Sequence, residues 1–260
     1  MYQTLEIEKN GRVATLWMNR PEVFNACNEQ LVTDLSAACK ELDIDNSVRI
    51  VVLAGRGKHF SAGADVNWLK RASQFSAEES LADARRFASM LRTLAEMSKP
   101  TIARIQGVAL GGGTGLTAAC DMAIASDTAV FATSEVKFGI IPSAISPYVL
   151  RAIGPRQALR YFQSGERISA QRALAIGLVN EVVPAPELDA KVAELAESLI
   201  LAGPKAQQAA KNLVRTVTGR PIDATLSEET AQGFARQRAT VEAKEGITAF
   251  LDKRQPAWLG

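Results

Sequence analysis

A run of glycines stands out in the segment Ala-Leu-Gly-Gly-Gly-Thr-Gly-Leu, which spans residues 109–116. Glycine has no Cβ, so such a run lets backbone N–H groups approach a ligand closely and lets the chain take positive φ. The run follows an apolar, strand-like segment and leads into a short helix-like one. Because the N-terminus of a helix attracts negative charge, this segment predicts an anion or oxyanion site.

A second loop of small residues, Phe-Ser-Ala-Gly-Ala-Asp at residues 60–65, follows the apolar run of residues 48–54. Open α/β sheets bind ligands at the carboxyl ends of their strands. Two such loops after neighbouring parallel strands would therefore lie side by side. We expect them to point two backbone N–H groups at one oxygen atom.

Histidine and cysteine are too scarce to carry the chemistry. The one histidine, His59, has neighbours that favour a structural or surface role, and its isolation removes most mechanisms that use imidazole as base or metal ligand. Cys27, Cys39 and Cys120 are odd in number and far apart, which argues against a disulfide framework and a zinc site. A carboxylate or the backbone must then do the work, and we expect neither a metal nor a redox cofactor.

The glycine stretch also fits a dinucleotide-binding motif. Residues 113–118 read Gly-Thr-Gly-Leu-Thr-Ala, which matches G-x-G-x-x-A, and Glu135 follows about 20 residues later. Against this alternative, the motif lies in the middle of the chain rather than in its first βαβ unit. The extra glycines Gly111 and Gly112 are also not required by that fingerprint.

The elements that would position the two loops alternate between strand and helix. Runs of β-branched and apolar residues predict strands, and apolar residues at helical spacing predict helices. The predicted strands are residues 4–8, 13–18, 48–54, 101–110, 121–126 and 129–135. The predicted helices are residues 28–42, capped by Asn28, and residues 77–97. This order favours an α/β fold in which residues 48–54 are buried on both faces of a parallel sheet.

The last third of the chain has a different character. From Ser146 onward we expect helices that follow one another between Gly and Pro breaks, with Ser169 as a helix N-cap and Gly177 just after a helix C-terminus. The length of 260 residues suits one main domain with an appendage. We therefore predict an α/β core over residues 1–200 and a helical C-terminal region over residues 201–260.

Composition excludes several functional classes. Hydrophobic residues make up 47% and charged residues 22%, as in ordinary globular proteins. The 30 basic and 28 acidic residues are spread along the chain, so we expect no nucleic-acid partner. The N-terminus lacks the regions of a signal peptide, and no apolar run approaches the roughly 20 residues that cross a bilayer. We expect a cytoplasmic protein without a membrane partner.

Several ordered segments resemble the enoyl-CoA hydratase/isomerase (crotonase) superfamily. They are Asn19–Ala26 (NRP-x-x-x-NA), His59–Asp65, Lys99–Gly113, Ser134–Pro142, Ile168–Pro184 and Phe250–Trp258. The resemblance spans nearly the whole chain and is specific, because several motifs must match in order. Residues 135–149 and the glycine at position 115 make it most similar to the bacterial methylglutaconyl-CoA hydratase-like branch.

The resemblance implies a spiral of ββα turns with a helical trimerisation region, assembled as a trimer or a dimer of trimers. It implies acyl-CoA thioesters as substrates, with coenzyme A as part of the substrate and no separate cofactor. The backbone N–H groups of Ala62 and Gly112 would form the oxyanion hole for the thioester carbonyl. Two such donors stabilise an enolate-like oxygen by roughly 3 kcal/mol each. The residues implied in binding the substrate and its coenzyme A are Val23, Ala26, Ala62, Gly63, Ala64, Asp65, Gly112, Phe250 and Lys253.

Of these, Phe250 and Lys253 match C-terminal positions that reach the coenzyme A from a neighbouring helix or subunit. Trp68 and Leu69, just past the second loop, could wall the acyl pocket or pack in the core. Arg20 could meet a phosphate of coenzyme A or face solvent.

One acidic side chain of the family pattern is missing. Hydratases of the best-known branch carry two glutamates; one corresponds to Glu135, but the other position holds Gly115. A single carboxylate could move a proton between C2 and C4, as in Δ3,Δ2-enoyl-CoA isomerases. It could also serve a hydratase in which the substrate or another residue holds the water, or remain in a protein that only binds thioesters. We favour a hydratase that acts on a short or branched 2-enoyl-CoA.

Glu135 is then the general acid/base, with Ala62 and Gly112 as its oxyanion-hole partners. For this role near neutral pH, the pKa of the Glu135 carboxyl must be raised by apolar surroundings. We expect its neighbours Val136, Phe138 and Ile140 to supply them.

Overall fold

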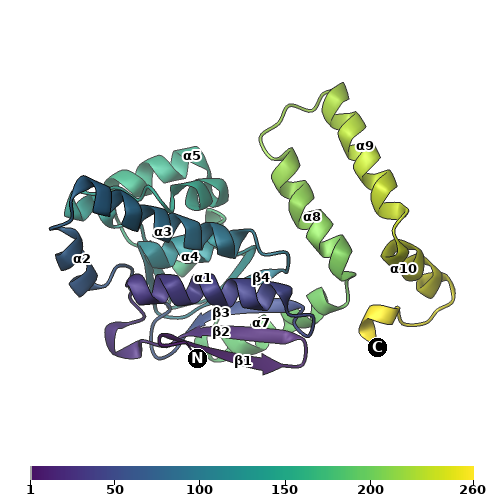
Figure 1. The fold of residues 1–260 in the computed structure, drawn as a ribbon, viewed down its shortest axis with the longest axis horizontal. Coiled ribbons are helices and arrows are strands. Elements are labelled where there is room, and N and C mark those ends of the chain that lie inside the picture. The colour runs from purple at the N-terminus through teal and green to yellow at the C-terminus, as the bar shows by residue number, and fades with distance from the viewer. Residues whose placement is uncertain (1) are drawn as a thin grey trace.

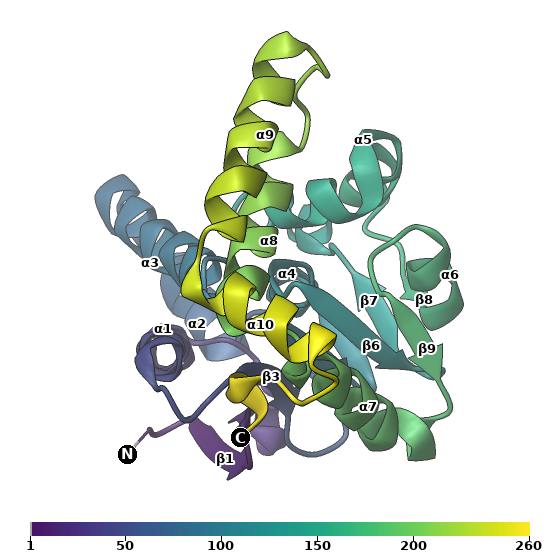
Figure 2. The same ribbon diagram turned by 90° about the vertical axis from the view of Figure 1, so that its right-hand side faces the viewer.

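The computed structural model describes residues 2–260, which form two sheets with helices on both sides (Figure 1, Figure 2). The larger sheet has six strands in the order β1-β2-β3-β4-β6-β9, in which only the β1–β2 pair is antiparallel. Its strands are β1 (Leu5–Asn10), β2 (Val13–Met18), β3 (Ile50–Gly55), β4 (Thr101–Ile105), β6 (Met122–Ser126) and β9 (Glu181–Val183).

The smaller sheet has the strand order β5-β7-β8. Its strands β5 and β7 each follow a strand of the larger sheet along the chain. Its strands are β5 (Val108–Leu110), β7 (Val130–Ala132) and β8 (Ile168–Ser169). The chain repeatedly passes from the larger sheet to the smaller one and then into a helix, as in β4-β5-α4 and β6-β7-α5. This is the ββα spiral that the resemblance implied.

Helices cover both faces of the larger sheet. They are α1 (Glu29–Ile44), α2 (Val66–Ala72), α3 (Ala77–Ala95), α4 (Gly112–Ala119), α5 (Ser146–Ser164), α6 (Ala170–Ala175), α7 (Leu188–Ile200), α8 (Pro204–Val217), α9 (Ala224–Arg238) and α10 (Val241–Leu251). Val51 and Leu53 of β3 pack in the main core with α1 and α3, whereas Ile50 and Val52 pack in a second core with α7. All six residues of β3 are buried, which confirms the predicted strand with two covered faces.

Several local predictions are confirmed. The strands at residues 4–8, 13–18 and 48–54 and the helices at 28–42 and 77–97 are present with ends shifted by a few residues. Asn28 accepts the N–H of Leu31 as the N-cap of α1, and Ser169 accepts the N–H of Arg172 as the N-cap of α6. Gly177 follows α6 with φ +82°. Capping chemistry depends on near neighbours in sequence, which is why it could be predicted.

Two predicted strands differ from the structure. Residues 101–110 form two strands in different sheets, because the chain turns at Gly107, whose φ is +62°. The strand predicted at 129–135 ends at Ala132, and Glu135 begins the 3-10 helix η2 (Glu135–Phe138). The last third is mostly helical, as predicted, and also contributes the short strands β8 and β9, the latter at the edge of the larger sheet.

The segment after Ile200 forms α8, α9 and α10, and Figure 1 shows α8 and α9 standing away from the α/β part of the chain. No residue of α8 is buried, and Leu226 is the only buried residue of α9. Polar contacts attach α8 to the rest: Lys211 pairs with Asp121 at 2.7 Å, and Arg215 donates to the carbonyl oxygen of Ala95.

The sheet order does not support the dinucleotide alternative. Strands β1 to β4 neighbour one another in chain order and the sheet then continues with β6 and β9 in the same direction. The glycine stretch therefore does not follow a point at which the strand order reverses, where dinucleotide crevices form. Within residues 2–260, no helix is long and apolar enough to cross a membrane.

Candidate active site

The two small-residue loops lie side by side, as predicted. An isolated parallel bridge joins Ser61 to Ala109, with the N–H of Ser61 3.0 Å from the carbonyl oxygen of Val108 and the N–H of Leu110 3.0 Å from that of Ser61. A Cβ on Gly63 would stand 2.8 Å from the carbonyl oxygen of Leu110, and the φ of Gly63 is +91°. Only glycine fits there, because both the space and the backbone conformation exclude a side chain.

The N–H of Ala62 is not free, so its predicted role as an oxyanion donor is wrong for this conformation. It donates to the carbonyl oxygen of Phe24 at 2.9 Å. Phe24 and Asn25 both have positive φ, at 56° and 54°, in the turn that brings this carbonyl to the loop. A backbone N–H engaged in this way would have to give up a good hydrogen bond to bind a ligand.

The N–H of Ala64 is the better donor in this loop. Its neighbours are fixed by Cys27, since the N–H of Cys27 donates to Gly63 at 2.6 Å and the N–H of Asp65 donates to Cys27 at 2.8 Å. The bridge turns the Ala64 N–H away from Cys27, and among the described residues it has no hydrogen-bond acceptor. Ala62 and Ala64 are the same residue type two positions apart, so the sequence carried no signal that distinguishes them.

The N–H of Gly112 is a second candidate donor, with no acceptor among residues 2–260. It is the first residue of α4, and the first N–H groups of a helix have no partner within the helix. Gly111 precedes it with φ +48°, and its own N–H is used by the carbonyl oxygen of Ala132 at 2.7 Å. A Cβ on Gly112 would meet the ring of Phe87 at 3.1 Å. The positive end of α4 therefore faces the space next to the Ala64 loop.

Glu135 lies beside this helix N-terminus. Its Oε1 is 3.2 Å from the place that a Cβ on Gly111 would take. Its Oε2 is buried and has no hydrogen-bond partner within the described residues. Burial raises the pKa of the Glu135 carboxyl above its usual value, with only a bond from its own backbone acting in the opposite direction. A buried carboxyl with a raised pKa and an open lone pair can accept or deliver a proton.

The source of this burial differs from the prediction. Phe138 is 68% exposed and Ile140 is 50% exposed, so neither of these neighbours shields Glu135. Val136 is half-buried and faces Gly165 at the end of α5, whereas Lys137 and Phe138 are exposed. Gly111 lies against the Glu135 carboxyl, and α5 packs against η2.

The carboxylate of Asp65 has a structural role. It caps α2 by accepting the N–H of Asn67 at 2.8 Å and pairs with Arg20 at 2.9 Å. Burial alone would raise the pKa of Asp65, but the Arg20 bond and the α2 N–H groups hold it below its usual range. Arg20 is therefore engaged by this pair, and the contact of Asp65 with coenzyme A stays a prediction.

The remaining predicted residues lie in two places. Val23 is the last residue of the 3-10 helix Pro21–Val23, and Ala26 is buried, with 6% of its surface exposed. Both lie in the segment directly before Cys27, which pairs with Ala64. Phe250, 81% exposed, and Lys253 lie at the end of α10, on the opposite side of the molecule from α2 (Figure 1). One chain alone does not bring Phe250 and Lys253 to Ala64.

Two aromatic residues flank the site. Trp68 of α2 and Phe87 of α3 have ring centroids 6.3 Å apart, and the indole N–H of Trp68 is buried without a partner in the described residues. Phe87 was missed at the sequence level because it lies on a long amphipathic helix with no local motif. His59 has the structural role expected for it, since its Nδ1 accepts the N–H of Val108 at 3.2 Å.

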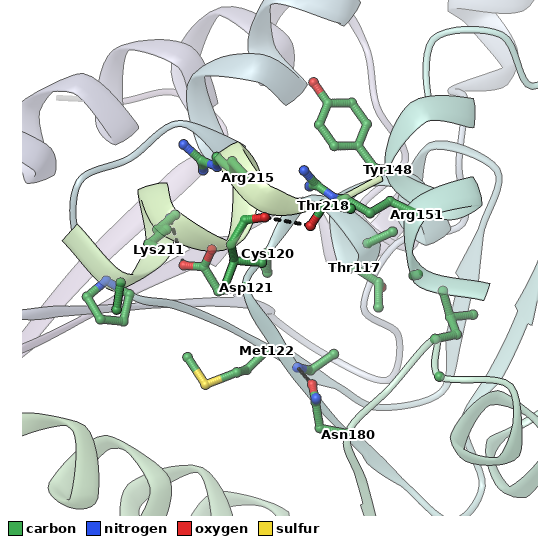
Figure 3. Close-up of a pocket in the computed structure, with 18 of the residues that line it drawn as sticks. Thr117, Cys120, Asp121, Met122, Tyr148, Arg151, Asn180, Lys211, Arg215 and Thr218 are labelled. Carbon is green, nitrogen blue, oxygen red and sulfur yellow. Dashed lines mark hydrogen bonds and ion pairs between the residues drawn. The ribbon is translucent and has the colours of Figure 1, made fainter. Parts of the chain in front are cut away.

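A cavity of about 500 Å³ lies elsewhere, between α8 and the α/β part of the chain (Figure 3). Asp121, Lys211, Arg215, Arg151 and Tyr148 line it together with small and apolar residues, and Lys211 and Asp121 point toward each other across one side. None of its lining residues is among the predicted site residues. Within residues 2–260, no three His, Cys, Asp or Glu side chains are grouped closely enough to hold a metal ion.

Known proteins are similar to this chain in sequence and in fold over nearly their full lengths. The enoyl-CoA hydratase/isomerase family profile matches residues 8–260. A crotonyl-CoA hydratase of Syntrophomonas wolfei is 35% identical over 98% of this chain and 97% of its own, and a short-chain-enoyl-CoA hydratase of Clostridium acetobutylicum is 34% identical over 96% and 95%. The crystal structure of an enoyl-CoA hydratase from Shewanella pealeana superposes with a TM-score of 0.96 at 36% identity, covering 99% of this chain and 97% of that one. This chain is therefore an enzyme of the enoyl-CoA hydratase/isomerase family.

Proposed function

We propose that this protein adds water to the double bond of a short or branched 2-enoyl-CoA thioester. The single observation that carries the proposal is the buried Glu135 carboxyl, with a raised pKa and an unpaired oxygen, beside the glycine-lined N-terminus of α4. The hydratase names of the relatives from Syntrophomonas wolfei and Clostridium acetobutylicum agree with this reaction.

In this proposal the thioester oxygen binds between the N–H groups of Ala64 and Gly112. Addition of water at C3 makes this oxygen enolate-like, and donors already fixed by the fold stabilise that charge without reorganising. Removal of one such donor typically costs about 2.7–4 kcal/mol of transition-state stabilisation. Ala64 replaces Ala62 here because the N–H of Ala64 has no acceptor within residues 2–260.

Glu135 acts as the general acid/base. Its carboxylate takes a proton from the water that attacks C3, and the resulting acid can return a proton to C2. Because Gly115 supplies no second carboxylate, Glu135 alone must activate the water and protonate the enolate. The raised pKa suits both directions of transfer near neutral pH.

Isomerisation of a 3-enoyl-CoA to a 2-enoyl-CoA remains the second candidate. One carboxylate suffices to move a proton from C2 to C4, and the absence of a side chain at Gly115 favours this reaction over a two-carboxylate hydration. The oxyanion hole would serve it equally, because the intermediate is again an enolate. The two reactions differ in the mass of the product.

We further propose that copies of this chain associate, as a trimer or a dimer of trimers, and complete one another's substrate sites. Many large apolar residues after residue 200 are exposed: Leu201, Leu213, Val214, Ile222, Phe234, Val241, Ile247, Phe250 and Leu251. The α/β part also exposes large apolar residues, among them Phe138, Ile140, Ile141 and Leu159. Two different patches on one chain suit a head-to-tail contact that closes into a ring. Phe250 and Lys253 of one copy would then reach the coenzyme A held by its neighbour.

The proposed function is tested with crotonyl-CoA, 3-methylglutaconyl-CoA and a 3-enoyl-CoA, followed by absorbance and product mass. We expect the wild type to add one water to at least one 2-enoyl substrate. Glu135→Gln keeps the size and hydrogen-bonding capacity of the side chain but cannot take up a proton. It should lower turnover at least about a hundredfold while thioester binding persists.

Glu78→Gln is the matched control, since Glu78 is an exposed residue in the first turn of α3. Its turnover should equal that of the wild type. Normal hydration by Glu135→Gln would rule out the assignment of Glu135. A shift of the double bond without a change of mass would replace the hydratase by the isomerase.

A further inference from the structure

Asn25 is a buried residue whose side-chain amide joins three backbone segments. It is 0% exposed. Its Oδ1 accepts the N–H of Arg20 at 2.9 Å, and its Nδ2 donates to the carbonyl oxygens of Arg56 and His59 at 2.9 and 2.8 Å. Both hydrogens of the amide group are therefore used, and they hold the chain that follows β3. A Cβ on Gly55, the last residue of β3, would stand 2.8 Å from this Nδ2, so glycine makes room for the amide.

The backbone at Asn25 takes an uncommon conformation. Phe24 and Asn25 have φ of 56° and 54°, and within residues 2–260 Lys253 is the only other non-glycine residue with positive φ. The left-handed region is costly for residues with a Cβ, and asparagine is among those that tolerate it best. The N–H of Asn25 also donates to the carbonyl oxygen of Arg20 at 2.9 Å. Backbone and side chain of Asn25 thus hold the same turn.

The carbonyl oxygens of this turn bind the loop of residues 60–65. The hydroxyl of Ser61 donates to the carbonyl oxygen of Asn25 at 2.8 Å. The N–H of Ala62 donates to that of Phe24 at 2.9 Å. The turn therefore fixes two neighbouring polar groups in the first half of the loop.

The same segment also binds the second half of the loop. Cys27, two residues after Asn25, is hydrogen-bonded to Gly63 and Asp65, which flank Ala64. The N–H of Ala64 is left without an acceptor in residues 2–260. Its direction is set by contacts on both sides of it, and these contacts come from the segment that Asn25 anchors.

We propose that Asn25 is a positioning residue for the oxyanion hole: its amide fixes the turn that holds the loop and thereby aims the Ala64 N–H at the thioester oxygen. This inference rests on the proposed function for the ligand of that N–H. Asn25 acts through the loop and touches no substrate, because it is buried and its polar atoms are all engaged. A displacement of about 1 Å in such a group costs about a hundredfold in rate.

The first test is Asn25→Gly, which allows the left-handed turn but removes the amide. We expect kcat on the preferred 2-enoyl-CoA to fall about a hundredfold, because the Ala64 donor is displaced. The Kd for butanoyl-CoA, which has no double bond to react, should change much less. Oxyanion contacts act mainly in the transition state, so their loss lowers kcat more than it weakens binding.

The direct readout is the stretching frequency of the thioester carbonyl in bound butanoyl-CoA, isotope-labelled at that carbon and measured by infrared difference spectroscopy. A hydrogen bond to the carbonyl oxygen lowers this frequency. We expect a lowered frequency in the wild type and a smaller shift in Asn25→Gly. A loss of stability without movement of the loop would leave the frequency of the folded protein unchanged.

Asp34→Ala is the control for loss of a buried polar side chain. Asp34 is 6% exposed, and its hydrogen bonds go to Gln3, Thr4 and Gln30 rather than to the loop. This variant should lower Tm and keep the wild-type kcat and carbonyl frequency. If Asn25→Gly behaved in the same way, the role of Asn25 would be structural only and the inference would be overturned.

Ser61→Ala tests the link between turn and loop in a variant that keeps the amide of Asn25, so it decides the matter even where Asn25→Gly does not fold. It removes the hydroxyl that binds the Asn25 carbonyl oxygen, and kcat should fall about tenfold. Ser126→Ala is the matched control, since both serines are 0% exposed and the Ser126 hydroxyl bonds Thr128 instead. Wild-type kcat and carbonyl frequency in both serine variants would contradict the proposed link.

These outcomes separate the inference from the proposed function. If the wild type hydrates and the Asn25 and Ser61 variants keep its kcat and carbonyl frequency, only the inference fails. If the wild type hydrates no thioester but lowers the carbonyl frequency, and Asn25→Gly reverses this, the proposed function fails and the inference stands. If the wild type binds butanoyl-CoA without lowering the frequency, the donor role of Ala64 and the inference fail together.

Discussion

The α/β part of the chain and the helices after residue 200 differ in how far their apolar side chains are buried. In β3 all six residues are buried between two layers of helices. In α8, which is as long as many core helices, no residue is buried, and Leu213 and Val214 are 50% and 62% exposed. Burial of apolar side chains thus stabilises the α/β part, whereas the helices after residue 200 expose an apolar surface that suits a protein interface.

Polar contacts hold the C-terminal helices to the core instead. Lys211 pairs with Asp121, Arg49 donates to the carbonyl oxygen of Ala202 at 2.7 Å, and Arg12 donates to the carbonyl oxygen of Gly260 at 2.9 Å. Such contacts orient a segment but supply little net free energy compared with a packed core. The core thus builds the candidate site, and the exposed apolar surface after residue 200 is where the proposed association of copies can be tested.

The largest effect should come from a charge on the exposed apolar surface after residue 200. Phe234→Asp places a carboxylate on a side chain that is 65% exposed in the single chain. If copies associate through it, the dissociation constant should rise by at least roughly thirtyfold, as for an interface hot spot. Mass measured by light scattering after size-exclusion chromatography checks this.

The control for this variant is Ile44→Asp, at the end of α1, where the side chain is 82% exposed. It adds the same charge to the α/β part and should leave the mass unchanged. If Phe234→Asp kept the wild-type mass at every concentration while Ile44→Asp lowered it, the roles assigned to the two regions would be reversed.

A smaller effect should follow from breaking the contact that joins the two regions. Lys211 is 11% exposed, and burial lowers the pKa of its ammonium group while the Asp121 carboxylate acts against that. Lys211→Met leaves Asp121 without its cation but with the two hydrogen bonds from Thr101, at a cost of about 1.5 kcal/mol, or roughly 3–6 °C in Tm. Thermal unfolding measures it, with Lys205→Met at the exposed start of α8 as control. An unchanged Tm would mean that α8 is not held by this pair.

The smallest effect concerns the pH dependence of stability at the site. Burial raises the pKa of Glu135 in the folded state above its unfolded value, so charging this carboxyl opposes folding. The penalty is absent below the ordinary carboxyl pKa and grows as pH rises through the raised one. Glu135→Gln should therefore unfold a few degrees higher than the wild type near pH 8, with the difference vanishing toward pH 4. A difference that grows on acidification would contradict the burial of this carboxyl.

Much of the molecule follows from local sequence rules. The apolar run of β3, the Asn28 and Ser169 caps, and the left-handed Gly177 all depend on residues within a few positions, so their patterns predict them directly. The ordered motifs also indicated the family and the position of Glu135. These features need no knowledge of which distant segments meet.

Only the tertiary structure decided which atoms the site can use. The carbonyl oxygen of Phe24 occupies the N–H of Ala62 and leaves that of Ala64 free, although the two residues are chemically identical. Phe138 faces solvent instead of shielding Glu135, and Ile145, thirty residues from Gly115, takes the space of the missing side chain. Hydrogen-bond partners and excluded volume come from segments that are distant in sequence, and a local pattern carries no information about them.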